Sequence, residues 1–273
     1  MKKLLLSFLL VPAMAHAEIT VVNPQARSSP TTVMAMSYQK SVPDSSFYQA
    51  ENCQDGVKKF EGTPNSTIVY GTNLEITALR RGQSCLPKIT KDNILFYGEQ
   101  FYQICTKKGS NKTFRSPKAT YGMASVQPVN EIVADINAQN GTSLVGLPFA
   151  GSRDVLLQVL SGDLDLGLIG TSVAAKHERA GDITCIASTD PRDKDFVGQQ
   201  LKMKMPDIRI QTLIVHNIQD SKLVDKARRG LAETGFLGIL KEGDFSNVKT
   251  QPSQELVDLT LRYINRANQA YGK

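Results

Sequence analysis

Five short segments rich in glycine and small hydroxyl residues lie where an apolar run passes into a helical pattern. They are residues 27–32, 71–73, 125–127, 151–153 and 170–172. The first turn of a helix has backbone N–H groups without an intrahelical acceptor, and the helix dipole places partial positive charge there. Such helix ends bind carboxylates and phosphates. The segments therefore point to capture of a small acidic molecule rather than to chemistry performed on one.

Two arginines and several hydroxyl or amide side chains in and around these segments are candidate ligand-binding groups. A guanidinium can hold a carboxylate through two parallel hydrogen bonds, so Arg27 and Arg153 are the charged candidates. The candidate set is Arg27, Ser28, Thr31, Gly71, Thr72, Asn73, Ser125, Phe149, Gly151, Ser152, Arg153, Thr171 and Ser172. The alternatives are solvated arginines, hydroxyls that only cap helices, and a phenylalanine that only packs.

Side chains and motifs common in catalysis are sparse. Of the three histidines, His16 falls in the N-terminal leader described below, which leaves His177 and His216. No serine lies in a GxSxG elbow, and neither GxGxxG nor GxxxxGK[ST] occurs. Asp163 and Asp165 flank a predicted helix-to-strand turn, where a structural role is expected. We therefore expect a protein that is not an enzyme and that needs no cofactor and no metal ion.

The first 17 residues have the pattern of a cleavable export signal. Two lysines precede an apolar run at residues 4–11, and residues 15–17 read Ala-His-Ala, which is a small-x-small cleavage site. The apolar run is too short to span a bilayer. We expect cleavage before Glu18 and a periplasmic location. The alternative is an apolar N-terminal helix in the folded core.

The charge of the chain is mildly basic and evenly spread. The formal net charge is +6, and the longest basic runs are short pairs such as Arg80-Arg81 and Arg228-Arg229. Nucleic-acid binding requires a clustered basic patch, so we expect no nucleic-acid partner. The chain contains no tryptophan, which disfavours a sugar receptor that stacks its ligand on indole rings.

The four cysteines, Cys53, Cys85, Cys105 and Cys185, all follow the leader. An even number of cysteines in an exported chain favours disulfides, and three pairings are possible. We favour Cys53–Cys85 together with Cys105–Cys185, because the second pair lies in two apolar strand-like runs that could lie side by side. Four free buried thiols are the alternative. No cysteine–histidine cluster has the spacing of a zinc site.

Strand-like and helix-like patterns alternate along the chain. The expected strands are residues 18–23, 66–70, 119–123, 143–147, 164–169, 183–188 and 208–216, with 94–106 readable as two strands broken at Gly98. The expected helices are residues 31–38 with Thr31 or Thr32 as N-cap, 128–139, 153–160, 172–180, 221–240 and 254–270. This alternation predicts an α/β fold with mostly parallel sheets and helices on both faces.

The order of these motifs resembles the extracytoplasmic solute receptors of tripartite tricarboxylate transporters, within the type 2 periplasmic binding proteins. The motifs are Tyr121-Gly122-Met123-Ala124-Ser125, Leu147-Pro148-Phe149-Ala150-Gly151, Leu160-Ser161-Gly162-Asp163-Leu164-Asp165, Gly170-Thr171-Ser172 and Ala180-Gly181-Asp182. The resemblance covers most of the chain after the leader, and it is best over residues 119–190 and in the last helices.

The sequence departs from the family in two places. After the first strand the family usually carries a Pro-Gly-Gly loop, whereas residues 24–30 here read PQARSSP and contain no glycine. Without glycine the backbone can approach a ligand less closely. The segments around Cys53 and Cys85 also look additional to the family pattern.

The resemblance implies two α/β lobes joined by two crossing strands that act as a hinge, with a ligand bound between the lobes. We expect residues 18–105 and 186–273 to form lobe 1, and residues 106–185 to form lobe 2, after a signal peptide at 1–17. It also implies a monomeric receptor that captures a di- or tricarboxylate and delivers it to a large and a small inner-membrane transporter subunit. The alternative is a periplasmic sensor or interaction protein on the same fold, which feeds a signalling partner.

Overall fold

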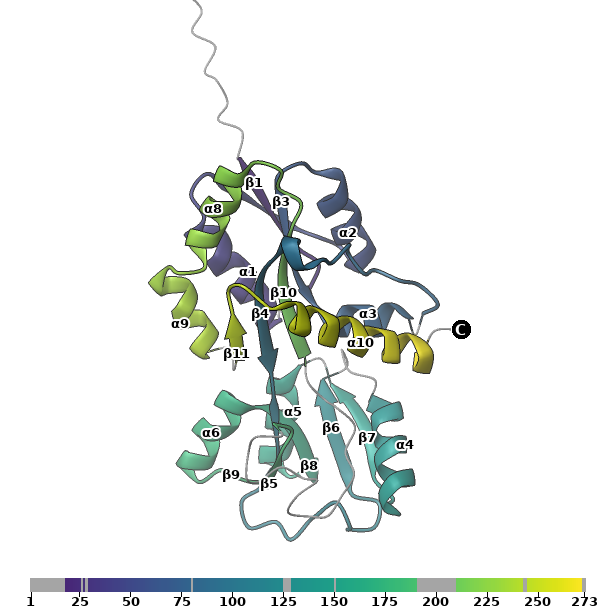
Figure 1. Ribbon diagram of the computed structural model, residues 1–273. Helices are drawn as coiled ribbons and strands as arrows, with labels where there is room; N and C mark the ends of the chain where they lie inside the picture. The colour runs from purple at the N-terminus through teal and green to yellow at the C-terminus, as the bar shows by residue number, and fades with distance from the viewer. Residues whose placement is uncertain are drawn as a thin grey trace, which may run out of the picture.

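Two β-sheets, each with helices on both faces, form two lobes in this computed structural model (Figure 1). The structure describes residues 18–25, 27, 29–79, 81–124, 129–149, 151–190, 210–242 and 245–271. The expected signal peptide at residues 1–17 lies outside them. None of the described helices is long and apolar enough to cross a membrane.

Lobe 1 is built from both ends of the chain. Its first part contains β1 (Ile19–Asn23), α1 (Pro30–Ser41), β2 (Ser45–Gln49), α2 (Cys53–Gly62), β3 (Ser66–Gly71), α3 (Thr72–Leu79), the 3-10 turn η1 (Lys91–Asn93) and β4 (Ile94–Gln100). Its second part contains β10 (Ile210–His216), α8 (Ser221–Gly230), α9 (Thr234–Glu242), β11 (Phe245–Lys249) and α10 (Gln254–Tyr271). The sheet of lobe 1 is therefore complete only after the chain has returned from lobe 2.

Lobe 2 is continuous in the sequence. It contains β5 (Tyr102–Lys107), β6 (Thr120–Ala124), α4 (Val129–Asn140), β7 (Val145–Phe149), α5 (Ser152–Ser161), β8 (Leu166–Gly170), α6 (Thr171–Ala180) and β9 (Ile183–Ser188). Helices α5 and α6 both end at a glycine in the left-handed conformation, at Gly162 with φ 88° and at Gly181 with φ 79°. These ends agree with the expected helices at 153–160 and 172–180. Glycine suits both positions, because it adopts positive φ without a Cβ clash.

The two sheets are mixed. Their strand orders are β11-β4-β10-β3-β1-β2 and β7-β6-β8-β5-β9. Pairs within the β–α–β units are parallel: β1 with β2 and β3, and β6 with β7 and β8. Strands β10, β4 and β11, and likewise β5 and β9, pair antiparallel. The α/β fold with helices on both faces is confirmed, and its sheets combine parallel units with antiparallel strands that serve the crossings.

The register of lobe 1 brings three strand ends to one edge. Gly71 at the end of β3 lies opposite Thr212 in β10, and Ile210 at the start of β10 lies opposite Gln100 at the end of β4. Phe101 follows Gln100 and leads directly into β5. The start of α3, which follows Gly71, therefore lies at the edge where the chain leaves lobe 1.

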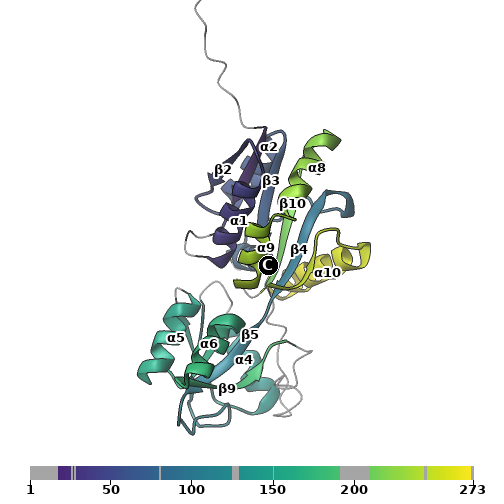
Figure 2. The ribbon, with the colours of Figure 1, turned by 90° about the vertical axis from the view of Figure 1, so that its left-hand side faces the viewer.

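The register of lobe 2 likewise brings strand ends to the edge at the crossing. Tyr102 at the start of β5 lies opposite Gly170 at the end of β8, which passes directly into α6. Tyr102 also exchanges two hydrogen bonds with Thr189, at 2.8 and 2.9 Å. The starts of α3 and α6 thus lie on either side of the segment at Phe101, and Figure 2 shows β4 and β5 continuing one another between the lobes.

The sheets change at Phe101, before β5, and after β9. The expected lobe boundaries at residues 105 and 185 would cut through both of these strands, whereas each belongs whole to the second sheet. The expected break at Gly98 also moves to Phe101, because β4 continues through Gly98. A Cβ at Gly98 would lie 2.9 Å from the Phe96 ring and 3.1 Å from that of Phe245, so this glycine serves close packing instead of a break. We propose to draw the lobe boundaries at the changes of sheet.

Each sheet carries an apolar cluster on both faces. In lobe 1, α1, α8 and α9 pack on one face around Tyr38 and Phe236, whose rings meet edge to face at 5.8 Å between centroids. Helices α2 and α10 pack on the other face through Phe60 and Val257. In lobe 2, α4 covers one face, and α5 and α6 cover the other. Burial on both faces explains why strands such as β3 are buried along their whole length.

The favoured disulfide pairing is confirmed. Cys53 at the start of α2 is bonded to Cys85, and Cys105 in β5 is bonded to Cys185 in β9. Cys105 and Cys185 are direct partners in the antiparallel register, as the two apolar runs suggested. The second bond therefore joins the two strands through which the chain enters and leaves lobe 2.

Two further expectations are wrong in detail, and two strands were missed. The N-cap of α1 is Ser29, whose hydroxyl accepts from the Thr31 N–H, instead of Thr31 or Thr32. The expected helix at 221–240 is two helices, because α8 ends at Gly230 against the end of α1. A Cβ at Gly230 would meet the Val42 side chain at 2.6 Å, so the close approach requires glycine. Strands β2 and β11 were not expected, since neither has an uninterrupted apolar run.

Removal of the Tyr121 hydroxyl is expected to stabilise lobe 2. This hydroxyl is fully buried, burial raises its pKa, and it has no hydrogen-bond partner within the described part of the chain. Tyr121→Phe should raise the free energy of unfolding by about 1 kcal/mol, because a buried polar group without a partner is costly. Urea denaturation followed by circular dichroism measures this change.

Tyr97→Phe is the matched control. The Tyr97 hydroxyl donates to Glu99 at 2.7 Å and accepts from Gln211 at 3.2 Å, so its removal should lower the free energy of unfolding by about 1–3 kcal/mol. Equal destabilisation by the two substitutions would contradict the expectation.

Candidate functional site

The site is defined by the helix starts that face the crossing at Phe101. In lobe 1 these are the starts of α1 and α3, which follow β1 and β3. In lobe 2 they are the starts of α5 and α6, which follow β7 and β8. Strands β1, β2 and β3 are parallel, as are β6, β7 and β8, so their carboxyl ends share one edge in each lobe. Ligands of open α/β sheets bind at such carboxyl edges.

A network of amide side chains covers the lobe 1 edge. Asn23, at the end of β1, is fully buried and donates to Thr32 at 2.8 Å and to Gln49 at 2.9 Å. The Gln49 amide in turn donates to the backbone carbonyl of Gln25 at 2.8 Å. These bonds fasten the loop after β1 to the ends of β1 and β2.

Gln25 extends this network across the sheet to β3. Its side-chain amide donates to the Asn73 carboxamide at 3.4 Å, and only 4% of Gln25 is exposed. A Cβ built on Gly71 would lie 2.5 Å from the Gln25 amide nitrogen and 2.4 Å from the Asn73 oxygen. The Gln25 side chain therefore lies directly over Gly71, and this approach requires that position to lack a side chain.

Most candidate residues of lobe 1 are buried and already hydrogen bonded. Thr72 is fully buried and accepts from the Gln211 backbone N–H at 3.2 Å. Thr31 is buried, and its N–H is held by Ser29. Arg27 is exposed in the loop before α1, and Ser28 lies outside the described residues. The structure thus brings Gly71, Thr72 and Asn73 to the edge, under Gln25.

The helix starts of lobe 2 are more open. Both α5 and α6 begin after a glycine, Gly151 and Gly170, and neither N-cap supplies a side-chain hydrogen bond. Ser152 is half-buried and Arg153 is exposed in the first turn of α5. Within the described residues, no hydrogen bond engages the N–H groups of Ser152 and Arg153, and both groups belong to the turn that favours an anion.

The remaining lobe 2 candidates have varied positions. The Thr171 hydroxyl donates to the Phe101 carbonyl at 3.1 Å, which ties α6 to the crossing. Phe149 is half-buried and packs against the cluster beneath α5, where its ring would lie 2.8 Å from a Cβ on Gly122. Ser172 lies in the first turn of α6, and Ser125 falls outside the described residues.

Two buried glutamates are polar features of the lobe 1 edge that the sequence patterns did not single out. Glu75, in the first turn of α3, accepts from the Cys85 N–H and the Ser84 hydroxyl, both at 2.7 Å. Glu99, near the end of β4, accepts from Tyr97 at 2.7 Å and Asn247 at 3.1 Å. Each carboxylate accepts on both oxygens. The only sequence signal was an acidic residue inside an otherwise apolar run, at Glu99.

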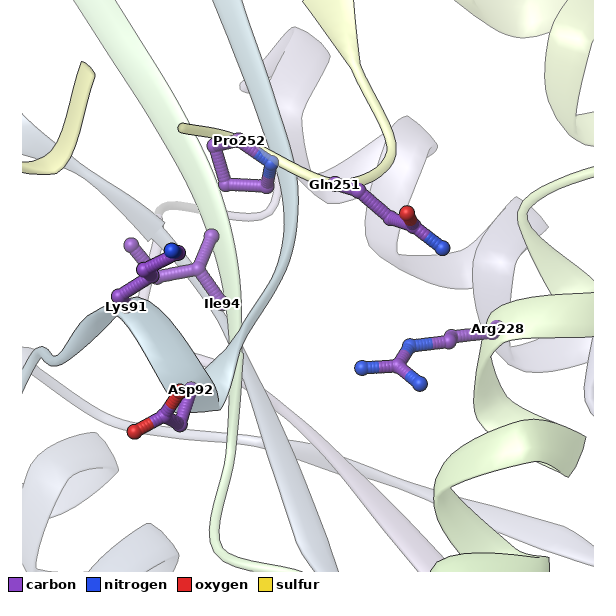
Figure 3. A pocket seen from close by; sticks show the side chains of 6 residues that line it. All are labelled: Lys91, Asp92, Ile94, Arg228, Gln251 and Pro252. Atoms are coloured by element: carbon purple, nitrogen blue, oxygen red, sulfur yellow. The ribbon is translucent and has the colours of Figure 1, made fainter. Parts of the chain in front are cut away.

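A separate hollow of about 470 Å³ lies elsewhere in lobe 1 (Figure 3). It is lined by Lys91, Asp92, Ile94, Arg228, Gln251 and Pro252. Ile94 begins β4, so this hollow lies at the opposite end of that strand from the crossing. It shares no residue with the candidate set. Among the residues that the structure describes, no group of three or more His, Cys, Asp or Glu side chains could hold a metal ion.

Three solved structures are similar to this chain over 92% of its length. The TctC solute binding protein from Polaromonas, without ligand, is 13% identical, is covered over 96% of its length and gives a TM-score of 0.65. MatC from Rhodopseudomonas palustris, with bound malate, is 14% identical, with 97% coverage and a TM-score of 0.61. A second R. palustris protein, with adipate, is 13% identical, with 95% coverage and a TM-score of 0.62.

By sequence, no family model and no curated protein matches the chain. The structural likeness at these identities establishes the fold, and it agrees with the resemblance seen in the order of the sequence motifs. The chain has the two-lobed fold of the tricarboxylate-receptor type of periplasmic binding proteins.

Proposed function

We propose that this protein is a periplasmic solute-binding receptor for a small organic acid. The observation that carries the proposal is the pair of glycine-preceded helix starts, α5 and α6, at the lobe 2 edge that faces the crossing. Backbone N–H groups at such starts replace the water that a carboxylate loses on binding. The similar structures that contain malate and adipate support an acidic ligand of the di- or tricarboxylate class.

The two-lobed architecture suits capture rather than catalysis. A ligand that contacts both edges binds the closed arrangement better than the open one, and so shifts the population toward closure. We propose that the closed, monomeric receptor then delivers its ligand to inner-membrane transporter subunits, one large and one small. In this role the protein needs no cofactor, performs no reaction and has no nucleic-acid partner.

Carboxylates are expected to stabilise the purified protein against heat. A ligand at 100 times its dissociation constant adds about 2.7 kcal/mol to the stability of the native state. For a chain of this size the melting temperature should rise by about 5–10 °C. A thermal-shift screen of mono-, di- and tricarboxylates, with amino acids and sugars beside them, measures this rise. Stabilisation by sugars or amino acids and by no carboxylate would refute the acid receptor.

Arg153→Ala is expected to weaken carboxylate binding by about tenfold or more, because one charge-assisted hydrogen bond contributes about 1.5–3 kcal/mol. Arg27→Ala is expected to weaken it less, since Arg27 is exposed in a loop whose helix start is already capped. Isothermal titration with the best acid of the screen measures both affinities.

Arg115→Ala is the control for loss of one positive charge. Arg115 is exposed in the loop between β5 and β6, at the end of lobe 2 away from the crossing. Its removal should leave the affinity unchanged, and all three variants should keep the melting temperature of the wild type without ligand. Unchanged affinity in both Arg27→Ala and Arg153→Ala would remove these arginines from the site.

A further inference from the structure

The start of α1 has few backbone donors left for an anion. Pro30 at its first position has no N–H. The Thr31 N–H is bound to the Ser29 hydroxyl at 3.2 Å, and the N–H groups of Thr32 and Val33 are bound to the Ser29 carbonyl at 2.9 and 3.4 Å. The feature that makes other helix starts attract carboxylates is therefore already satisfied within the protein.

The start of α3 is covered by a side chain of the protein itself. Gln25 is buried over Gly71 and bonded to Asn73, as described above. No described residue donates a hydrogen bond to its carboxamide oxygen. Gln25 thus occupies the space over the second helix start of lobe 1 and presents an amide there.

The elements of this edge carry negative charge, which is unfavourable for a second anion. The carboxylate of Glu75 lies in the first turn of α3. Glu99 lies opposite Gln211 in the sheet, and the Gln211 backbone N–H binds Thr72. A ligand carboxylate at this edge would lose water over the amide of Gln25, and two of the elements that form the edge, α3 and β4, each carry a buried carboxylate. Like charges in such surroundings oppose ionisation and binding.

Lobe 2 has the opposite character. The N-caps of α5 and α6 are glycines without a side-chain hydrogen bond. The first turn of α5 holds Arg153 beside Asp154, whereas the first turn of α3 holds Glu75 without a basic neighbour in that turn. One edge of the site therefore offers backbone donors to an anion, and the facing edge offers the carboxamide oxygen of Gln25 to a hydrogen-bond donor.

We propose that Gln25 is a specificity-determining residue, and that the ligand presents one carboxylate to lobe 2 and a hydrogen-bond donor, instead of a second carboxylate, to lobe 1. This inference rests on the proposed organic-acid receptor, but it replaces the di- or tricarboxylate class named there by acids with a single carboxylate. The favoured ligand is a monocarboxylate with an amide or hydroxyl group at its far end. Gln25 disfavours the dicarboxylate of the same length, because its amide fills the place of a backbone anion site.

The test compares matched acids that differ at one end. Succinate with succinamate, and adipate with adipamate, exchange one carboxylate for an amide at constant length. Isothermal titration of the purified full-length mature protein should show the monoamide of at least one pair binding about tenfold or more tightly than its diacid. In Gln25→Ala this preference should fall at least fivefold, because the start of α3 becomes open to the diacid.

Gln39→Ala is the control, since Gln39 is another hydrogen-bonded glutamine of lobe 1 that binds Ser45 away from the crossing edge. It should keep the preference of the wild type. Should Gln25→Ala fail to fold, Gln25→Glu retains the size of the side chain. It should weaken the diacids further while the monoamides lose less.

The outcomes separate the inference from the proposed function. Equal or tighter binding of both diacids by the wild type overturns the inference and leaves an acid receptor in place. A monoamide preference that persists in Gln25→Ala removes Gln25 as its cause. Binding of no acid in either pair, together with binding of another ligand class, overturns the proposed function itself.

Discussion

The arrangement of the whole molecule depends on the passage of one strand line through Phe101. Because Gln100 ends a strand of one sheet and Tyr102 begins a strand of the other, the two sheets must present their edges to the same point. The Thr171 hydroxyl and Thr189 hold this passage by hydrogen bonds from the lobe 2 side. The helices that start at those edges therefore begin next to the passage at Phe101, and this placement follows from the backbone and not from their side chains.

The two lobes place helix starts at the crossing in the same way, but the groups at these helix starts differ between the lobes. In lobe 2 the edge carries glycines and open helix starts, which suit an anion. In lobe 1, Ser29 accepts from the first turn of α1, Pro30 supplies no N–H, and Gln25 lies over Gly71 at the start of α3. The glycine-free loop after β1 is therefore more than a missing motif. It covers this edge of lobe 1 with side chains where a glycine loop would expose backbone groups.

Local signals were sufficient for much of the fold and for little of the site. The β–α–β order and the stops at Gly162 and Gly181 depend on nearby residues, so the sequence predicted them. The antiparallel pairing of β5 and β9 depends on where the chain crosses, which local patterns do not record. The position of Gln25 depends on Asn73, 48 residues later, and on the absence of a Cβ at Gly71. Sequence patterns based on glycine and hydroxyl residues do not identify such a glutamine.

The order of strands in lobe 1 has a consequence for how the chain is made. Strand β10 lies between β3 and β4, yet all of lobe 2 is synthesised before it. Until β10 is made, β3 has one unpaired edge and β4 has no partner strand, since its other neighbour, β11, is made later still. Such edges invite pairing with other chains. All strands of lobe 2 and both of its cysteines precede β10, so its sheet is complete in sequence while the N-terminal half of lobe 1 still lacks its central strand.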